Sequence, residues 1–257
     1  MRFKYGSIAL LLFVFAGSCA KEEPILKTEE VYHQELDDLL NTFKAETGIV
    51  IYYEASNDAE QKNLEIMHGI NSDVYYKGEK KYQLLQYWIE GLIDVLKAYP
   101  KTFMAKADLK SVFIVNSGSL SYSGIANLSK RSIAINRLHN AGYKETLAHE
   151  LFHLFDPAPA QSVWTTEQQQ FDMTWQSFNP PGFVYGDGCG LENTIKTYTQ
   201  GFITDYCRCN STEDRAVTFQ MLVFHSDMLL GKTINDSYLE SKVNFIRDLV
   251  NQYGYNL

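Results

Sequence analysis

The sequence lacks any apolar run of the about 18 residues that a membrane-spanning helix needs, which excludes a multi-span membrane protein. It is also short of positive charge, because 23 Lys and Arg stand against 31 Asp and Glu and give a net charge of −8. Nucleic-acid-binding proteins gain most of their affinity by neutralising phosphates, so we expect no nucleic-acid partner for this acidic chain. The 45% apolar and 21% charged residues are typical of a packed globular protein and exclude disorder as the main state.

Cysteine is scarce, with four in 257 residues, and three of these lie in the last third of the chain as Cys189, Cys207 and Cys209. An odd number leaves at least one thiol unpaired if disulfides form, and the sequence leaves the pairing open. A zinc site made of these three residues is an alternative, although Cys-x-Cys is a poor spacing for zinc ligands.

The first residues have the pattern of a secretory signal. Two basic residues precede a short apolar stretch over 8–16, and the small residues Gly17 and Ser18 follow it. The next residue is Cys19. Small residues before a cysteine resemble the lipobox of bacterial lipoproteins, in which that thiol is lipidated and becomes the new N-terminus. Plain signal cleavage nearby is the alternative.

The Lys-Glu-Glu sequence at 21–23 resembles the surface-export tag of lipoproteins in one Gram-negative phylum, with a simple polar tether as the alternative. We therefore expect an outer-membrane lipoprotein that is exposed at the cell surface. Residues 1–18 would be the signal peptide, 19–30 a lipid-anchored tether and 31–257 a single catalytic domain. Removing 1–18 takes away two positive charges, so the mature chain has a net charge of −10, from 21 basic and 31 acidic residues.

The spacing of apolar residues predicts six helices and four short strands. The helices are expected over 34–47, 82–99, 143–155, 192–206, 213–230 and 238–253, and the strands over 49–53, 111–115, 122–128 and 132–136. Four of the six prolines lie in 156–186, which predicts a long irregular loop there. Short strands close together indicate an antiparallel or mixed sheet beside helices, the α+β class.

The main motif is HExxH, formed by His149, Glu150 and His153. Residues four apart lie on one face of a helix, so the two imidazoles can bind a single ion. Zinc readily accepts imidazole nitrogen, and Glu150 lies close enough to take a proton from a water bound to the ion. The alternative is a pair of ordinary helix histidines with a Glu between them by chance.

A catalytic zinc site usually has three protein ligands, so a third is expected downstream. The position six residues after the second histidine is Pro159, which excludes the metzincin pattern. Asp156 is too close in sequence to be a comfortable ligand and is expected to orient an imidazole. The best candidate is Glu213, and Asp214 and Glu192 compete with it.

Glu213 also has a structural interpretation, because it stands three residues after Asn210 and could complete a capping box. Ser211 and Asp214 make an equally good box, which leaves Glu213 free. Ala216 follows one turn after Glu213, and so small a residue lets two helices approach each other.

The run AHELFHLFD, followed by Tyr206 seven residues before Glu213, resembles a gluzincin site. It is similar to the peptidase domain of anthrax lethal factor over roughly residues 145–157 and 205–220. The resemblance implies that Tyr206 donates a hydrogen bond to the oxyanion. One residue departs from the pattern, since Val217 stands where the lethal-factor-like site has a second Glu.

Together with its lipoprotein start, the whole chain resembles the zinc-binding metallopeptidases that are exported as surface lipoproteins beside TonB-dependent transporters. That family is called substrate import-associated zinc metallohydrolase lipoprotein. The resemblance implies a zincin-like domain in which a small mixed or antiparallel sheet packs on helices, the HExxH helix among them. It also implies a Zn²⁺ cofactor held by His149, His153 and Glu213.

The same resemblance implies a peptide or protein substrate, attachment to the membrane through the N-terminal lipid, and the transporter with its surface lipoprotein as partners. Glu150 would act as general base and pass the proton to the leaving amine. An extended peptide could pair with the strand at 132–136. Two other functions stay open, a non-catalytic surface protein that hands cargo to a transporter, and a zinc hydrolase of non-peptide amide bonds.

Overall fold

The computed structural model describes residues 28–53, 82–115, 122–137, 142–160, 163–187, 189 and 199–257. The predicted signal peptide, Cys19, the sequence at 21–23 and Glu192 lie outside the described residues.

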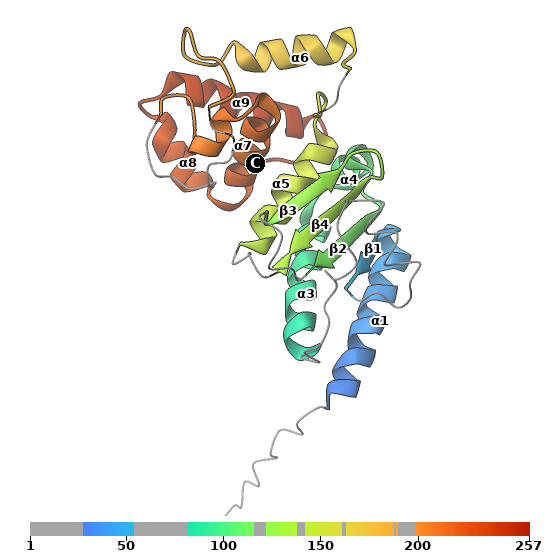
Figure 1. Cartoon of the computed structure of the whole chain (residues 1–257). Coiled ribbons are helices and arrows are strands. Elements are labelled where there is room, and N and C mark those ends of the chain that lie inside the picture. The colour runs from blue at the N-terminus through green and yellow to red at the C-terminus, as the bar shows by residue number, and fades with distance from the viewer. Residues whose placement is uncertain are drawn as a thin grey trace, which may run out of the picture.

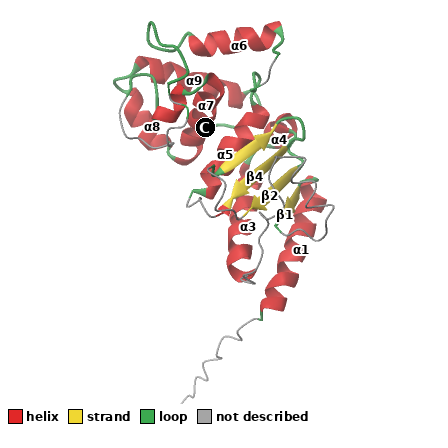
Figure 2. Ribbon diagram, viewed as in Figure 1, coloured by secondary structure: helices red, strands yellow, loops and turns green. Residues whose placement is uncertain are grey.

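The described residues form helices before, between and after four short strands (Figures 1 and 2). In chain order the elements are α1 Glu29–Thr47, β1 Val50–Tyr52, α3 Tyr82–Ala98, α4 Lys101–Ala107, β2 Ser111–Val115, β3 Gly124–Asn127, β4 Ser132–Asn136, α5 Tyr143–Phe155, α6 Thr166–Gln176, the 3₁₀ helix η3 Asp205–Arg208, α7 Ser211–Phe224, α8 Ser226–Thr233 and α9 Ser237–Asn251.

The strands form one mixed sheet in the order β1-β2-β4-β3, in which β3 alone runs antiparallel to its neighbour. Every residue of β2 and β4 is buried, as the near-continuous apolar runs of these two strands require. The half-buried β3 forms one edge. The mixed sheet is confirmed. Peptide pairing with the strand at 132–136 was a wrong prediction, because β4 is already paired on both sides.

Helix α5 connects the sheet to the C-terminal helices. It packs on β3 and β4, touches α3 and α4, and lies along α7, which in turn contacts α8 and α9. A stack of aromatic rings fills the junction of α4, α5 and α7, with ring centroids 4.2 Å apart for Phe103 and Phe155 and 4.8 Å apart for Phe152 and Phe219. Figure 1 shows α6 outside the group of C-terminal helices, where Phe171 packs against Phe245 of α9. Helices α5 and α7, which carry the predicted ligands, are therefore anchored in one aromatic core.

Three predictions of local structure were wrong. The proline-rich stretch contains α6, which begins at a capping box formed by Thr165 and Gln168. A helix was expected over 192–206, but residues 199–204, the described part of this range before η3, are not helical. Gly201 has a φ of +83° there and turns the chain. The helix expected over 213–230 breaks at His225 into α7 and α8. Helix α5 has the predicted bounds, and α1 begins five residues before its predicted start.

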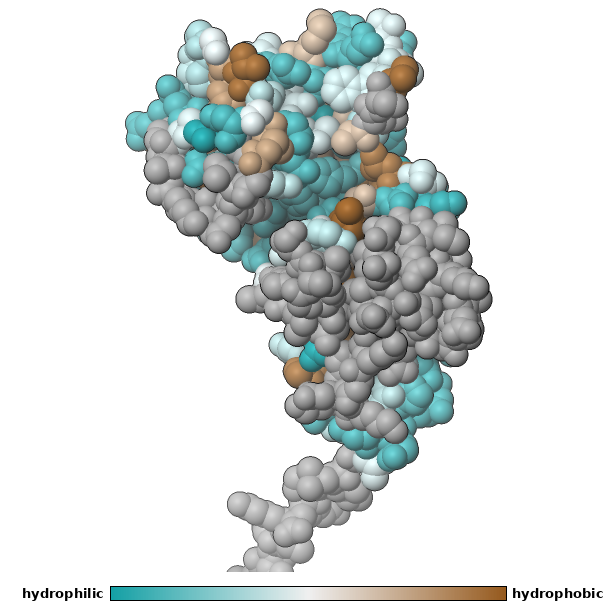
Figure 3. Space-filling model, viewed as in Figure 1, coloured by the Kyte–Doolittle hydropathy of each residue, from teal (hydrophilic) through white to brown (hydrophobic). Residues whose placement is uncertain are grey.

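On the face drawn in Figure 3 the coloured atoms are mostly hydrophilic, and hydrophobic atoms form small separate groups. Within the described part of the chain, no helix combines the length and the apolar character that crossing a bilayer would take.

Candidate metal centre

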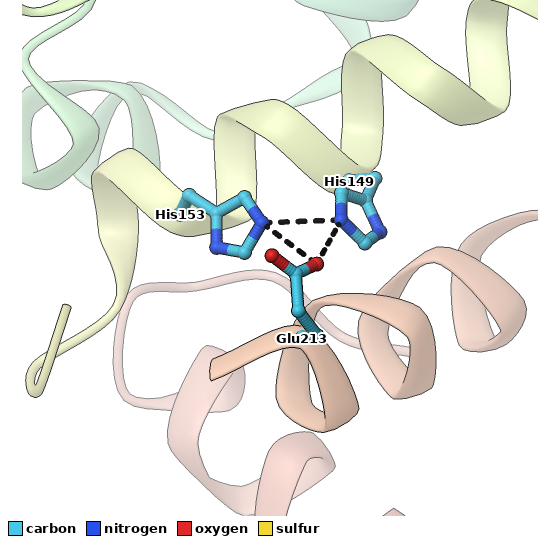
Figure 4. Close-up of side chains that lie close together, drawn as sticks. All are labelled: His149, His153 and Glu213. Atoms are coloured by element: carbon cyan, nitrogen blue, oxygen red, sulfur yellow. Dashed lines mark hydrogen bonds and ion pairs between the residues drawn. The ribbon is translucent and has the colours of Figure 1, made fainter. Parts of the chain in front are cut away.

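The two motif histidines lie side by side on the face of α5 that turns toward α7 (Figure 4). They are one helical turn apart, and their Nε2 atoms are 3.1 Å from each other. Apolar residues on the other faces of α5, among them Leu147 and Leu151, are completely buried and fix the rotation of the helix. The predicted helical face is therefore formed, and it presents both imidazoles to one point.

Glu213 approaches the same point from the first turn of α7. Its Oε2 lies 2.9 Å from Nε2 of His149 and 3.3 Å from Nε2 of His153. The side chain of Asn210 caps α7 by accepting a hydrogen bond from the backbone N–H of Glu213, at 2.9 Å. The backbone of Glu213 thus completes the cap, while its carboxylate is free to face the histidines.

His149, His153 and Glu213 form a group that could hold a metal ion, since one ligand atom of each lies within 4.8 Å of the others. Two imidazoles and one carboxylate match a common catalytic zinc set, which leaves a coordination position for water or substrate. The side chains retain 9%, 13% and 18% exposure, so the group is sheltered but reachable. Nδ1 of His149 is buried with no hydrogen-bond partner, which leaves Nε2 as the nitrogen aimed at the group. The residues fit zinc.

Glu150 lies next to this group, between α5 and the edge strand β3. Burial raises the pKa of its carboxyl to about 7, with Glu213 adding to the rise and His149 and the backbone of Ala126 opposing it. Strand β3 passes close to the side chain of Glu150 at Gly124. A Cβ added at Gly124 would lie 3.0 Å from Oε1 of Glu150 and 2.5 Å from Thr146. A side chain at position 124 would collide with the carboxylate.

Tyr206 lies in η3, on the side of Glu213. Its hydroxyl lies near the carboxylate of Glu213, and its ring centroid is 6.4 Å from that of His149. Burial and the nearby charges of Glu213 and Glu150 raise the pKa of Tyr206 well above its ordinary value. The hydroxyl therefore keeps its proton and can act as a donor beside the three potential ligands.

Asp214, the competing ligand candidate, points away from the histidines. Its Oδ2 accepts hydrogen bonds from Nζ of Lys242 at 2.7 Å, the hydroxyl of Tyr185 at 2.7 Å and Nε1 of Trp175 at 3.2 Å. The capping box proposed for Ser211 and Asp214 is not formed, because the Ser211 hydroxyl donates to Asp172 instead. The hydroxyl of Tyr185 is thus committed to Asp214.

The structure gives Asp156 a different role from the expected one of orienting an imidazole. Its Oδ2 accepts from Nε of Arg215 at 2.8 Å, and its Oδ1 accepts from the backbone N–H of Ala158 at 2.9 Å. Sequence reasoning missed Arg215, Asp172 and their buried contact. The sequence contained a signal for this contact, because the charged residues Asp214 and Arg215 precede a mostly apolar stretch of the same helix.

The cysteines do not form a metal site. Cys189 and Cys209 are joined by a disulfide, and Cys207 is a buried free thiol. Cys209 lies directly between η3 and the Asn210 cap of α7, so the disulfide anchors the segment that carries Tyr206 and leads to Glu213.

No family model matches the chain, and no curated protein matches it significantly. Among solved structures, the chain is similar to the crystal structure of a "putative zinc-binding metallo-peptidase" from Bacteroides caccae. The TM-score is 0.55, the sequence identity is 14%, and the match covers 88% of each chain. At this identity the likeness shows the fold, and it confirms the predicted α+β architecture with a mixed sheet packed on helices.

Proposed function

We propose that this chain is a zinc-dependent metallopeptidase. The observation that carries the proposal is the convergence of His149, His153 and Glu213 at one point, with the buried carboxyl of Glu150 beside them. The fold it shares with a protein named for zinc binding and peptidase activity supports the same reaction class.

In this proposal His149, His153 and Glu213 hold the ion. Zinc in such a site acts as a Lewis acid, which polarises a carbonyl group and makes a water molecule more acidic. Glu150 takes a proton from the attacking water and gives it to the leaving amine. Burial raises the pKa of this carboxyl, which suits a group that has to take up a proton and release it again. Tyr206 donates a hydrogen bond from its hydroxyl to the oxyanion of the tetrahedral intermediate and keeps its proton.

We expect an extended peptide to bind along the side of β3 that pairs with no other strand of the described residues. The N–H of Asn136 donates to the carbonyl of Ser123, so the alternation of antiparallel pairs turns the backbone groups of Gly124 and Ala126 away from β4. Those groups lie beside Glu150, with which the backbone of Ala126 already interacts. A peptide paired with this edge would bring its carbonyl groups close to the general base.

The test is zinc analysis of the purified mature protein, followed by digestion of an unbiased peptide library by wild type and Glu150→Gln. We expect about one zinc per chain in both proteins and cleavage by wild type alone. A surface protein that only carries cargo would bind peptides without cutting them. A hydrolase of other amide bonds would leave the library intact while cleaving non-peptide amides. Either result would overturn the peptidase proposal.

We also propose that the protein is a lipoprotein of the outer membrane that faces the outside of the cell, where it serves import together with a TonB-dependent transporter. The support is the lipobox-like sequence that ends in Cys19 and the acidic tag after it. A labelled fatty acid should attach to wild type and not to Cys19→Ala. Replacing residues 21–23 with alanine should keep the lipid and reduce the amount of protein that protease digests on intact cells.

A further inference from the structure

Three consecutive residues in the first turn of α7 point toward three different neighbours. Glu213 faces the histidines of α5, Asp214 faces Lys242 of α9, and Arg215 faces Asp172 of α6. Successive residues of an α-helix are about 100° apart around its axis, so these contacts hold the helix from three sides. A rotation of α7 that moved Glu213 would have to break the other two contacts.

The contact on the α6 side consists of a fully buried guanidinium shared by two helices. Arg215 donates from Nε to Asp156 at 2.8 Å, from Nη1 to Asp172 at 2.6 Å and from Nη2 to the carbonyl of Ala158 at 2.8 Å. Asp172 also accepts from the hydroxyl of Ser211, at 2.5 Å. The planar fork of Arg215 reaches three acceptors from three separate nitrogens, an arrangement that the single nitrogen of a lysine cannot reproduce.

The position of this contact in the chain links the two ligand-bearing helices. Arg215 comes two residues after Glu213, and Asp156 comes three residues after His153, at the end of α5. One guanidinium therefore ties the end of the histidine helix to the beginning of the glutamate helix. The distance between His153 and Glu213 is set by a connection that touches neither side chain.

The contact between Asp214 and Lys242 of α9 is equally buried. Nζ of Lys242 is fully buried, 2.7 Å from Asp214 and 2.8 Å from the carbonyl of Gly201, and it lies over the ring of Phe202. Removing charges from water is costly, so buried ion pairs are a poor source of net stability compared with apolar packing. Their presence on both sides of one potential ligand calls for a reason other than stability.

We propose that Arg215 and Asp214 are positioning residues, which fix the rotation of α7 so that Glu213 faces the histidines before a metal arrives. The inference rests on the proposed zinc site but not on peptide hydrolysis. A ligand held in place loses little conformational freedom on binding, so the pair raises metal affinity beyond its effect on folding.

The experiment measures the zinc dissociation constant of purified full-length mature protein by competition with a chromophoric chelator. Arg215→Lys keeps the charge and removes the fork. We expect its zinc affinity to fall by about 10- to 100-fold, the usual range for residues that support metal ligands. The absorption spectrum of the cobalt-loaded variant should also change, because cobalt reports the geometry of its ligands.

Leu36→Ala is the matched control for lost stability. Leu36 is fully buried in α1, which packs on α3 and β1, and it has no contact with the metal centre. This variant should melt earlier in the absence of metal yet keep the zinc affinity and the cobalt spectrum of wild type. If Arg215→Lys lowers the melting temperature and leaves both zinc affinity and cobalt spectrum unchanged, its role is structural only and the inference is overturned.

If Arg215→Lys does not fold, the same zinc-affinity measurement is made on Asp172→Asn. It keeps the shape of the side chain and leaves the contact between Arg215 and Asp156 in place, so a smaller loss of zinc affinity, several-fold, is expected. An unchanged affinity in this folded variant would overturn the inference. Failure of the peptidase proposal gives a different result, in which wild type binds zinc and the variants bind it more weakly, but no peptide is cut.

Discussion

The backbone of Ala126, on the edge strand β3, lies beside the carboxyl group of Glu150 on α5 and lowers the pKa of that carboxyl. Burial and, to a smaller extent, the charge of Glu213 favour the protonated carboxylic acid, whereas His149 and then the backbone of Ala126 favour the carboxylate. The balance puts the pKa near 7, where the group can both accept and release a proton. The strand that we expect to bind the peptide therefore also tunes the proposed general base.

Glu150→Gln should leave zinc binding intact, abolish nearly all turnover and stabilise the metal-free protein at pH 8. The folded pKa of Glu150 is raised from its ordinary value of 4.5 to about 7, so between these values the folded protein holds a proton that the unfolded chain has released. Wild type consequently loses stability as the pH rises through this window, by about 3 kcal/mol at most. The variant avoids that loss.

Urea unfolding of chelator-treated wild type and Glu150→Gln at pH 8 and at pH 4.5 checks the direction of this pH dependence of stability. The advantage of the variant should be largest at pH 8 and nearly vanish at pH 4.5. An equal difference at both pH values would show that the carboxyl of Glu150 does not titrate with a raised pKa.

Glu213→Ala should reduce zinc occupancy sharply, as should His149→Ala and His153→Ala, because each removes one of three ligand atoms that meet at one point. Glu145→Ala is the matched control. Glu145 is an acidic residue on α5 itself, but it pairs with His225 at a partly exposed position. Zinc content after dialysis, measured by mass spectrometry, should stay at the wild-type level in this control.

Gly124→Ala should lower both stability and turnover. The added Cβ would lie 2.9 Å from Cγ of Glu150 and 2.5 Å from Thr146, so the strand or the general base must move. Overpacking of this kind typically costs about 1–3 kcal/mol. Gly231→Ala is the control, since that glycine lies in α8 and a Cβ there would meet no atom within 4 Å. It should gain about 0.4–1 kcal/mol and keep wild-type activity.

Replacing both Cys189 and Cys209 with alanine should lower stability by about 3 kcal/mol, the usual effect of opening a loop of this order of length. Turnover should fall more than zinc content, because the disulfide anchors the segment of Tyr206 while Asn210 still caps α7. Cys207 is buried, so in wild type it should react with a thiol reagent only after unfolding. Rapid labelling of Cys207 in the folded protein would contradict the structure.

The parts of the fold with a clear apolar period could be predicted from the sequence. Most buried residues of helix α5 are apolar and recur at helical spacing, so its bounds followed from the pattern. Helix α6 is mostly polar and short of buried residues, so its prolines and polar residues suggested a loop, although the capping box at Thr165 and Gln168 was readable. Tertiary contacts of a few aromatic residues determine this helix.

The candidates for the third ligand could be ranked from the sequence, but the residue that lies beside the histidines could not be decided. Glu213 and Asp214 are neighbours, and the choice depends on which face of α7 turns toward α5. That rotation is set by Lys242, 28 residues from Asp214, and by Asp156, 59 residues from Arg215. A local sequence pattern cannot reveal contacts between residues that are so far apart along the chain. The cysteine pairing was undecidable for the same reason.

Tyr206→Phe tests whether the tyrosine takes part in the chemistry or only packs beside the site. The change keeps the ring and deletes the hydroxyl, which in the structure lies near the carboxylate of Glu213. Since burial and two nearby carboxylates raise the pKa of Tyr206, the hydroxyl is protonated over the whole working range and available as a donor. An interaction made only in the transition state raises kcat and leaves ground-state binding unchanged.

Removal of one oxyanion donor typically costs about 10²–10³ in kcat, so we expect a loss of that size in Tyr206→Phe, with KM within a few-fold of wild type. Zinc content should stay at one per chain, because His149, His153 and Glu213 are untouched. Tyr185→Phe is the matched control, since that hydroxyl donates to Asp214 in the core and should affect stability more than kcat. If the two variants lose stability alike and Tyr206→Phe turns over at the wild-type rate, Tyr206 is a packing residue and the oxyanion has another donor.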